Sequence, residues 1–71
     1  MVNNVKNTER LLSTKEAATF LGMSTQWLMT DRYKSKHWGT PPVVPYMRLG
    51  SRTIRYRLSD LRALISDDSF N

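Results

Sequence analysis

The chain has 71 residues and a formal net charge of +5, which allows one small domain with a modest core and disfavours an enclosed active site. It contains no cysteine, so neither a disulfide framework nor a thiolate metal site supports the fold. No apolar run approaches the roughly 20 residues of a membrane span. Residues 1–10 also lack the apolar segment of a signal peptide. A cytoplasmic protein with no membrane segment and no cofactor is therefore expected.

The positive charge is confined to the middle of the sequence. Seven basic residues and no acidic residue lie between Arg32 and Arg57, whereas the rest of the chain carries four basic and six acidic residues. Such segregation is typical of proteins that bind a polyanion. The alternative is a solvated face that keeps the protein soluble, although intermixed charges would serve that purpose equally well.

The first predicted element follows a polar, aperiodic stretch at residues 1–10, which is expected to be a flexible arm. Ser13 and Glu16 have the spacing of a capping box, which predicts a helix over residues 14–21. Gly22 suits the left-handed residue that ends a helix. The apolar face of this helix would carry Ala17, Ala18 and Leu21.

A second helix is predicted to begin after Ser24, an N-cap candidate, and to run from Thr25 to about Tyr33. Gly39 and the two prolines after it forbid helix beyond Trp38. Two short helices joined by such a turn are typical of a helix-turn-helix, and the alternative is an ordinary helical hairpin. The offsets of small and apolar residues that favour the first interpretation are those of Ala18, Gly22 and Leu28.

The sequence from Tyr46 to Leu58 alternates apolar and basic residues on both sides of Gly50-Ser51, which predicts an antiparallel hairpin. We expect an inner face of Met47, Leu49, Ile54 and Tyr56. The opposite face would carry Arg48, Arg55 and Arg57, with Arg52 at the tip. Ser59 is expected to cap a last short helix, and the apolar side of this helix would carry Leu61, Leu64 and Ile65.

These elements predict how the chain would contact DNA. In a helix-turn-helix the second helix enters the major groove with its N-terminal end first. Gln26 could bond an adenine edge, while Thr25 and Thr30 could contact phosphates or a thymine methyl group. Trp27 would either cover the core, which we favour, or lie against the sugar-phosphate backbone. The candidate DNA-binding residues are Ser24, Thr25, Gln26, Trp27, Thr30, Arg32, Lys34, Arg48, Ser51, Arg52, Arg55 and Arg57.

The hairpin would act as a wing in the minor groove. Its four arginines and absent lysines favour forked contacts with phosphates or bases, because a guanidinium group can bond in bidentate fashion. The alternative is an exposed edge ribbon that charge protects against aggregation. Enzymatic alternatives are weaker, since His37 is the one histidine of the chain and its three glycines are isolated. No catalytic residue and no metal site are expected.

The motifs "LLSTKEAATFLGMS" and "PPVVPYMRLGSRTIRYRLSDLRALI" resemble excisionases and AlpA-type regulators, which are small DNA-binding proteins with a MerR-like winged helix-turn-helix. The resemblance covers about residues 11–65. Two departures are Trp27, where relatives usually have threonine, and the stretch "DRYKSKHWGTPP", which is longer than the usual connection between recognition helix and wing.

The resemblance implies a small α+β winged helix-turn-helix domain at residues 11–66, between the arm and a polar tail at 67–71. It implies recognition-helix contacts by Thr25, Gln26 and Thr30, and wing contacts by Ser51, Arg52 and Arg55. The implied function is that of an excisionase, which binds specific double-stranded DNA, bends it and directs a tyrosine integrase toward excision. Because the chain is too small for a separate dimerisation domain, we expect a monomer whose copies could associate side by side on DNA. The alternatives are a transcriptional regulator with the same fold and an anti-repressor or other protein-interaction module.

Overall fold

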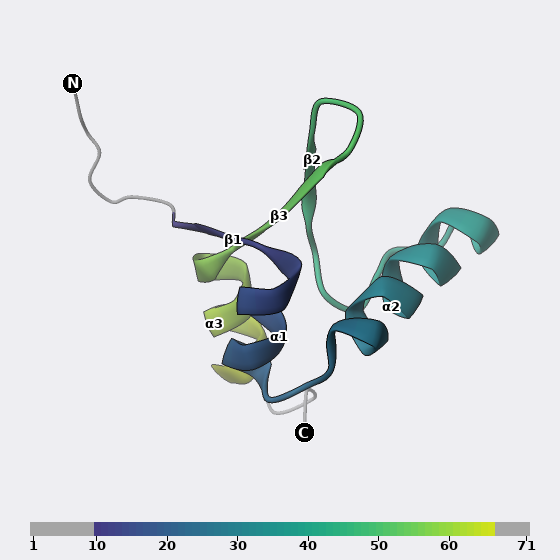
Figure 1. Cartoon of the computed structure of the whole chain (residues 1–71). Helices are drawn as coiled ribbons and strands as arrows, with labels where there is room; N and C mark the ends of the chain where they lie inside the picture. The colour runs from purple at the N-terminus through teal and green to yellow at the C-terminus, as the bar shows by residue number, and fades with distance from the viewer. Residues whose placement is uncertain (1–9, 67–71) are drawn as a thin grey trace.

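Six elements follow one another in the part of the chain that the structure, a computed structural model, describes, residues 10–66 (Figure 1). They are β1 (Leu11–Leu12), α1 (Thr14–Leu21), α2 (Thr25–Trp38), β2 (Met47–Leu49), β3 (Thr53–Arg57) and α3 (Leu58–Ser66). The tail at 67–71 and the arm up to residue 9 lie outside this range. Arg10, assigned to the arm from sequence, is part of the fold, because its carbonyl accepts a hydrogen bond from the Leu58 N–H at 2.8 Å.

Helix α1 begins and ends where the sequence predicts. The Glu16 N–H donates to the Ser13 hydroxyl at 3.1 Å, and the Ser13 N–H donates to the Glu16 carboxylate at 2.9 Å. At the other end Gly22 has a φ of 72°, and the Met23 N–H closes the helix by donating to the Ala18 carbonyl. The capping box and the glycine therefore set the length of this helix.

Helix α2 is longer than predicted. It runs to Trp38 instead of ending near Tyr33, so that it uses every residue before Gly39. Apolar periodicity is weak after Leu28, but no residue of α2 before Gly39 is a glycine or a proline that would break the helix. Gly39 then takes a φ of 68° and donates its N–H to the Ser35 carbonyl. A left-handed glycine, and not a loss of amphipathicity, ends α2.

The sheet has three antiparallel strands in the order β1-β3-β2, and its first strand was not predicted. Leu11 pairs with Arg57 and Leu12 with Tyr56, so β1 adds to the free edge of the hairpin. Two residues are too few to show an alternating pattern in sequence. The consequence is that β3 is the central strand and is held from both sides.

The register of the hairpin overturns the expected single basic face. Met47 pairs with Arg55 and Arg48 with Ile54, and cross-strand partners lie on the same face of a sheet. Arg48 therefore shares a face with Ile54 and Tyr56, while Arg55 and Arg57 lie on the other. The loop between Leu49 and Thr53 has three residues, whereas the expected faces required the two-residue turn Gly50-Ser51. One additional loop residue shifts the register by one and exchanges the faces.

The core lies where α1, α2, α3 and β3 meet. It consists of Leu12, Ala17, Ala18, Leu28, Val44, Tyr56 and Leu61. Leu49 and Ile65, both expected to face inward, are instead exposed. Ser59 lies within the first turn of α3 and does not precede it, because this helix follows β3 directly at Leu58. In Figure 1, α1 and α3 pack together beneath β1 and β3, α2 lies on the other side of α1, and the hairpin projects from the body.

Candidate nucleic-acid interface

The N-terminal half of α2 carries the first group of predicted DNA-binding residues. The Ser24 hydroxyl accepts the Trp27 N–H at 3.0 Å and so caps the helix. Beyond this cap, Thr25 and Gln26 are exposed. Ser24, Gln26, Trp27, Thr30 and Lys34 line one shallow groove with Asp31 and Val43. The structure therefore brings five predicted residues to one surface beside a helix N-terminus, where the helix dipole favours an anion.

Trp27 is not a core residue, contrary to the favoured expectation. Its side chain is 39% exposed and forms part of the groove wall. Leu28, the next residue along the helix, is fully buried and belongs to the core. The large indole ring is therefore available on the same surface as Gln26.

Arg32 has a structural role in the fold. One of its guanidinium nitrogens donates to the Tyr56 hydroxyl at 2.8 Å and to the Thr14 hydroxyl at 3.2 Å, and the group lies 5.8 Å from the centre of the Tyr46 ring. Burial raises the pKa of Tyr56 above its ordinary value of 10.0, and the hydrogen bond from Arg32 opposes this rise. Because these contacts hold α2 against β3 and α1, Arg32 is not a free phosphate ligand.

Asp31 fixes the chain that follows α2. Its two carboxylate oxygens accept the N–H groups of Val43 and Val44, each at 3.0 Å. Val44 is buried, whereas Val43 lies at the edge of the groove. The segment between α2 and the hairpin is thus tied back along the helix, which sets where the hairpin begins.

The hairpin arginines differ in how far their side chains are engaged. Arg52 is exposed in the loop, next to Ser51, which is exposed as well. Arg48 is also exposed and donates to the Ser51 carbonyl at 3.3 Å. Arg55 is half-buried and donates to the Ile54 carbonyl at 2.8 Å, whereas Arg57 is exposed opposite Leu11. Arg48, Arg52 and Arg57 are therefore the exposed cations of the hairpin, and Arg48 is held to the loop by its hydrogen bond.

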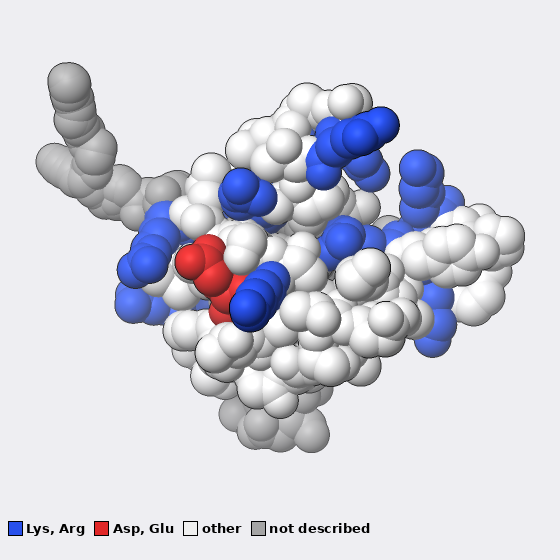
Figure 2. Space-filling view, viewed as in Figure 1, with Lys and Arg blue, Asp and Glu red and all other residues white. Residues whose placement is uncertain are grey.

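Basic side chains outnumber acidic ones on the face of the molecule that Figure 2 shows. Figure 2 shows basic side chains on the projecting hairpin and along α2, and further basic side chains beside the acidic ones over α1 and α3. The Glu16 carboxyl has a lowered pKa, chiefly because it accepts the Ser13 N–H, and the charges of Arg10 and Arg55 act in the same direction. This carboxylate therefore caps α1 and also attracts one arginine of the hairpin.

Sequence reasoning missed the last turn and a half of α2. Tyr33 and Trp38 are 66% and 65% exposed, and Tyr33 stacks on His37 with ring centres 5.6 Å apart. Lys36 and His37 lie beside Tyr33 around a small hollow on the C-terminal part of α2. The sequence signal for this part of α2 is the absence of glycine and proline before Gly39, which permits a helix through Tyr33, His37 and Trp38.

No group of three or more metal-ligating side chains occurs within residues 10–66, and no helix there is long and apolar enough to cross a membrane. Comparisons of the chain with models of protein families, with curated proteins and with solved structures find no match. The hydroxyl, amide and basic groups at the start of α2 and on the hairpin are of the kinds that bond phosphates and base edges.

Proposed function

We propose that the protein binds double-stranded DNA as a winged helix-turn-helix, with α2 in the major groove and the hairpin in the adjacent minor groove. The observation that carries this proposal is the groove on α2, which extends from the capped helix N-terminus past Gln26 and Thr30 to Lys34. Gln26 would bond an adenine edge, and Lys34 would contact a phosphate. Trp27 would lie against the sugar-phosphate backbone.

The two-sided hairpin changes how the wing would bind. The hairpin carries Arg48 on one face and Arg57 on the other. This arrangement suits a ribbon that enters a DNA groove edge-on, because the phosphates of the two DNA strands then lie on either side of it. Arg52 at the exposed loop would reach into the minor groove, where negative potential is enhanced. Arg55 would contribute less, since its side chain is half-buried and bonded to the Ile54 carbonyl.

The biological role that we propose is that of an excisionase. The protein would shape DNA at attachment sites and direct a tyrosine recombinase toward excision. This part rests on the resemblance of residues 11–65 to excisionases and AlpA-type regulators, of which the latter use the same fold to control transcription. An excision assay with a tyrosine integrase and its attachment sites separates the two, because only an excisionase shifts recombination toward the excised product.

Fluorescence anisotropy with a labelled duplex from the DNA flanking the gene tests the binding itself. Because cations that contact phosphates release counterions, the logarithm of affinity should fall linearly with the logarithm of salt concentration, with a slope of about −0.9 per phosphate contacted. Four to six contacts would give a slope of roughly −4 to −5. Affinity that does not change with salt would refute the proposal.

A further inference from the structure

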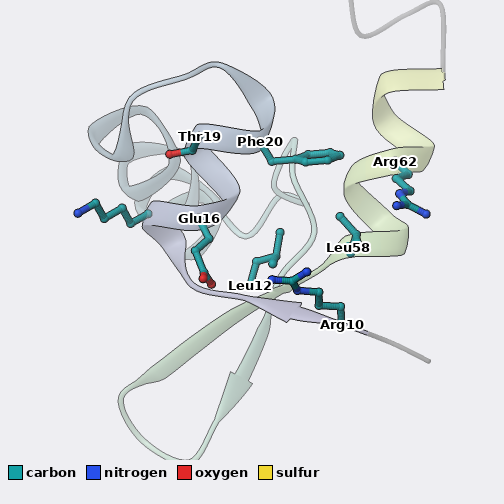
Figure 3. A pocket seen from close by; sticks show the side chains of 8 residues that line it. Arg10, Leu12, Glu16, Thr19, Phe20, Leu58 and Arg62 are labelled. Carbon is teal, nitrogen blue, oxygen red and sulfur yellow. The ribbon is translucent and has the colours of Figure 1, made fainter. Parts of the chain in front are cut away.

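A second groove lies away from the proposed DNA-binding surface, between α1, α3 and β1 (Figure 3). Its lining comes from all three elements and shares no residue with the groove on α2. The lining residues are Arg10, Leu12, Lys15, Glu16, Thr19, Phe20, Leu58 and Arg62. DNA binding as proposed above uses none of them, so this groove requires a separate explanation.

The floor of the groove is apolar. In Figure 3 the Phe20 ring extends from α1 toward α3, and the side chains of Leu12 and Leu58 point into the space beside it. Phe20 is 40% exposed, whereas Leu58 is half-buried and packs against the core. A single exposed apolar side chain is ordinary, but apolar groups that converge from three elements are typical of a contact surface.

The rim of the groove is positively charged. Arg10 lies just before β1, Lys15 lies on α1 and Arg62 lies on α3. The one carboxylate in the lining is that of Glu16, which accepts the Ser13 N–H at 2.9 Å and attracts Arg10, so that three positive charges stand against one negative charge. The charge that would complement this rim is therefore negative.

We propose that this groove binds a short acidic segment of a partner protein that inserts one large apolar side chain between Phe20 and Leu58. The carboxylates on either side of that anchor would pair with Arg10 and Arg62, and Lys15 would add to the attraction. A protein segment is favoured over nucleic acid because a duplex has phosphates but no protruding apolar group to cover Phe20 and Leu58. The inference does not depend on the proposed DNA binding.

The test is an NMR titration of the full chain, without DNA, using synthetic hexapeptides in which phenylalanine, leucine or tryptophan is flanked by glutamate and aspartate. At least one peptide should shift the amide signals of β1, the second half of α1 and α3, and leave those of Gln26 and Arg52 unchanged. Arg62→Glu should weaken binding about three- to tenfold, because it places a like charge beside the peptide carboxylates. The matched control is Lys36→Glu, the same charge change on exposed α2, which should leave the affinity nearly unaltered.

Two further measurements separate the alternatives. A peptide with serine in place of the apolar anchor should bind at least tenfold more weakly, since the floor would then gain no apolar contact. A short duplex DNA should not shift the signals of Phe20 or Leu58. The inference is wrong if no anchored peptide gives localised shifts, if the serine peptide binds as tightly, or if DNA occupies the groove.

Discussion

At the scale of single residues, Arg32 and Arg52 show that arginines of one basic segment can have opposite roles. Arg32 is half-buried and bonded to two hydroxyl groups, whereas Arg52 is exposed in the hairpin loop. The sequence groups them, because both belong to the same run without acidic residues. Their contacts in the fold lead to different predictions for their removal.

Arg32→Ala is expected to lower the free energy of unfolding by about 2 kcal/mol, because it leaves the buried Tyr56 hydroxyl without its partner. Arg32→Lys should recover little, since an ammonium group does not reproduce the planar fork. Urea denaturation followed by circular dichroism measures both. The control is Lys34→Ala, an exposed change on the same helix that should cost less than about 0.5 kcal/mol. Equal stability of Arg32→Ala and the unaltered protein would contradict this role.

Arg52→Ala should weaken DNA binding without affecting stability, because the side chain is exposed in the loop. Loss of one phosphate contact lowers the salt slope by about 1 and weakens binding similarly on all sequences. Gln26→Ala, in contrast, should reduce the preference for the specific site by about 1–3 kcal/mol. Anisotropy on specific and unrelated duplexes separates the two effects. An Arg52→Ala variant with unchanged affinity at moderate salt would show that the wing does not bind.

At the scale of elements, the caps and the anchor of the loop carry separate predictions. The lowered pKa of Glu16 means that its charged form stabilises the folded state. This contribution is present above the ordinary glutamate pKa of 4.5 and is lost as the pH falls below that value. Glu16→Gln should therefore reduce the drop in thermal stability between about pH 6 and pH 3. An unchanged acid sensitivity in that variant would argue against the capping box as its source.

Asp31→Asn should detach the segment between α2 and the hairpin. An amide can accept only through its oxygen, so one of the Val43 and Val44 N–H groups would face an NH₂ donor. We expect a loss of about 1–3 kcal/mol in the free energy of unfolding. The matched control is Asp60→Asn, where the same chemical change at the start of α3 should cost less than about 1 kcal/mol. Similar losses in both variants would indicate a general effect of charge and not of the anchor.

The elements also show how much of the fold the sequence could predict. The capping box at Ser13 and Glu16 and the left-handed Gly22 are local signals, and they correctly predicted the bounds of α1. The hairpin was expected as well, but its register depends on the number of loop residues, which alternation alone does not determine. Strand β1 and the side-chain partners of Arg32 depend on contacts between distant parts of the chain. For this reason the structure was needed to assign the faces of the hairpin.

At the scale of the whole molecule, we propose that the two grooves bind different partners, DNA on α2 and a protein segment between α1, α3 and β1. The proposed DNA surface combines α2 with the projecting hairpin, while the groove between α1, α3 and β1 lies apart from both. The position of the candidate residues at the start of α2 could be predicted from the sequence, because Ser24 marks the N-cap and helical spacing brings Gln26 and Thr30 to one surface. The apolar groove could not, because Leu12, Phe20 and Leu58 come together only through the packing of three elements.

The most direct test of the central claim is hydroxyl-radical and methylation footprinting on the DNA that flanks the gene. The account predicts a protected major-groove site beside a protected minor-groove tract, with Arg52→Ala removing only the minor-groove protection. Protection in one groove alone, or an identical footprint for Arg52→Ala, would contradict it.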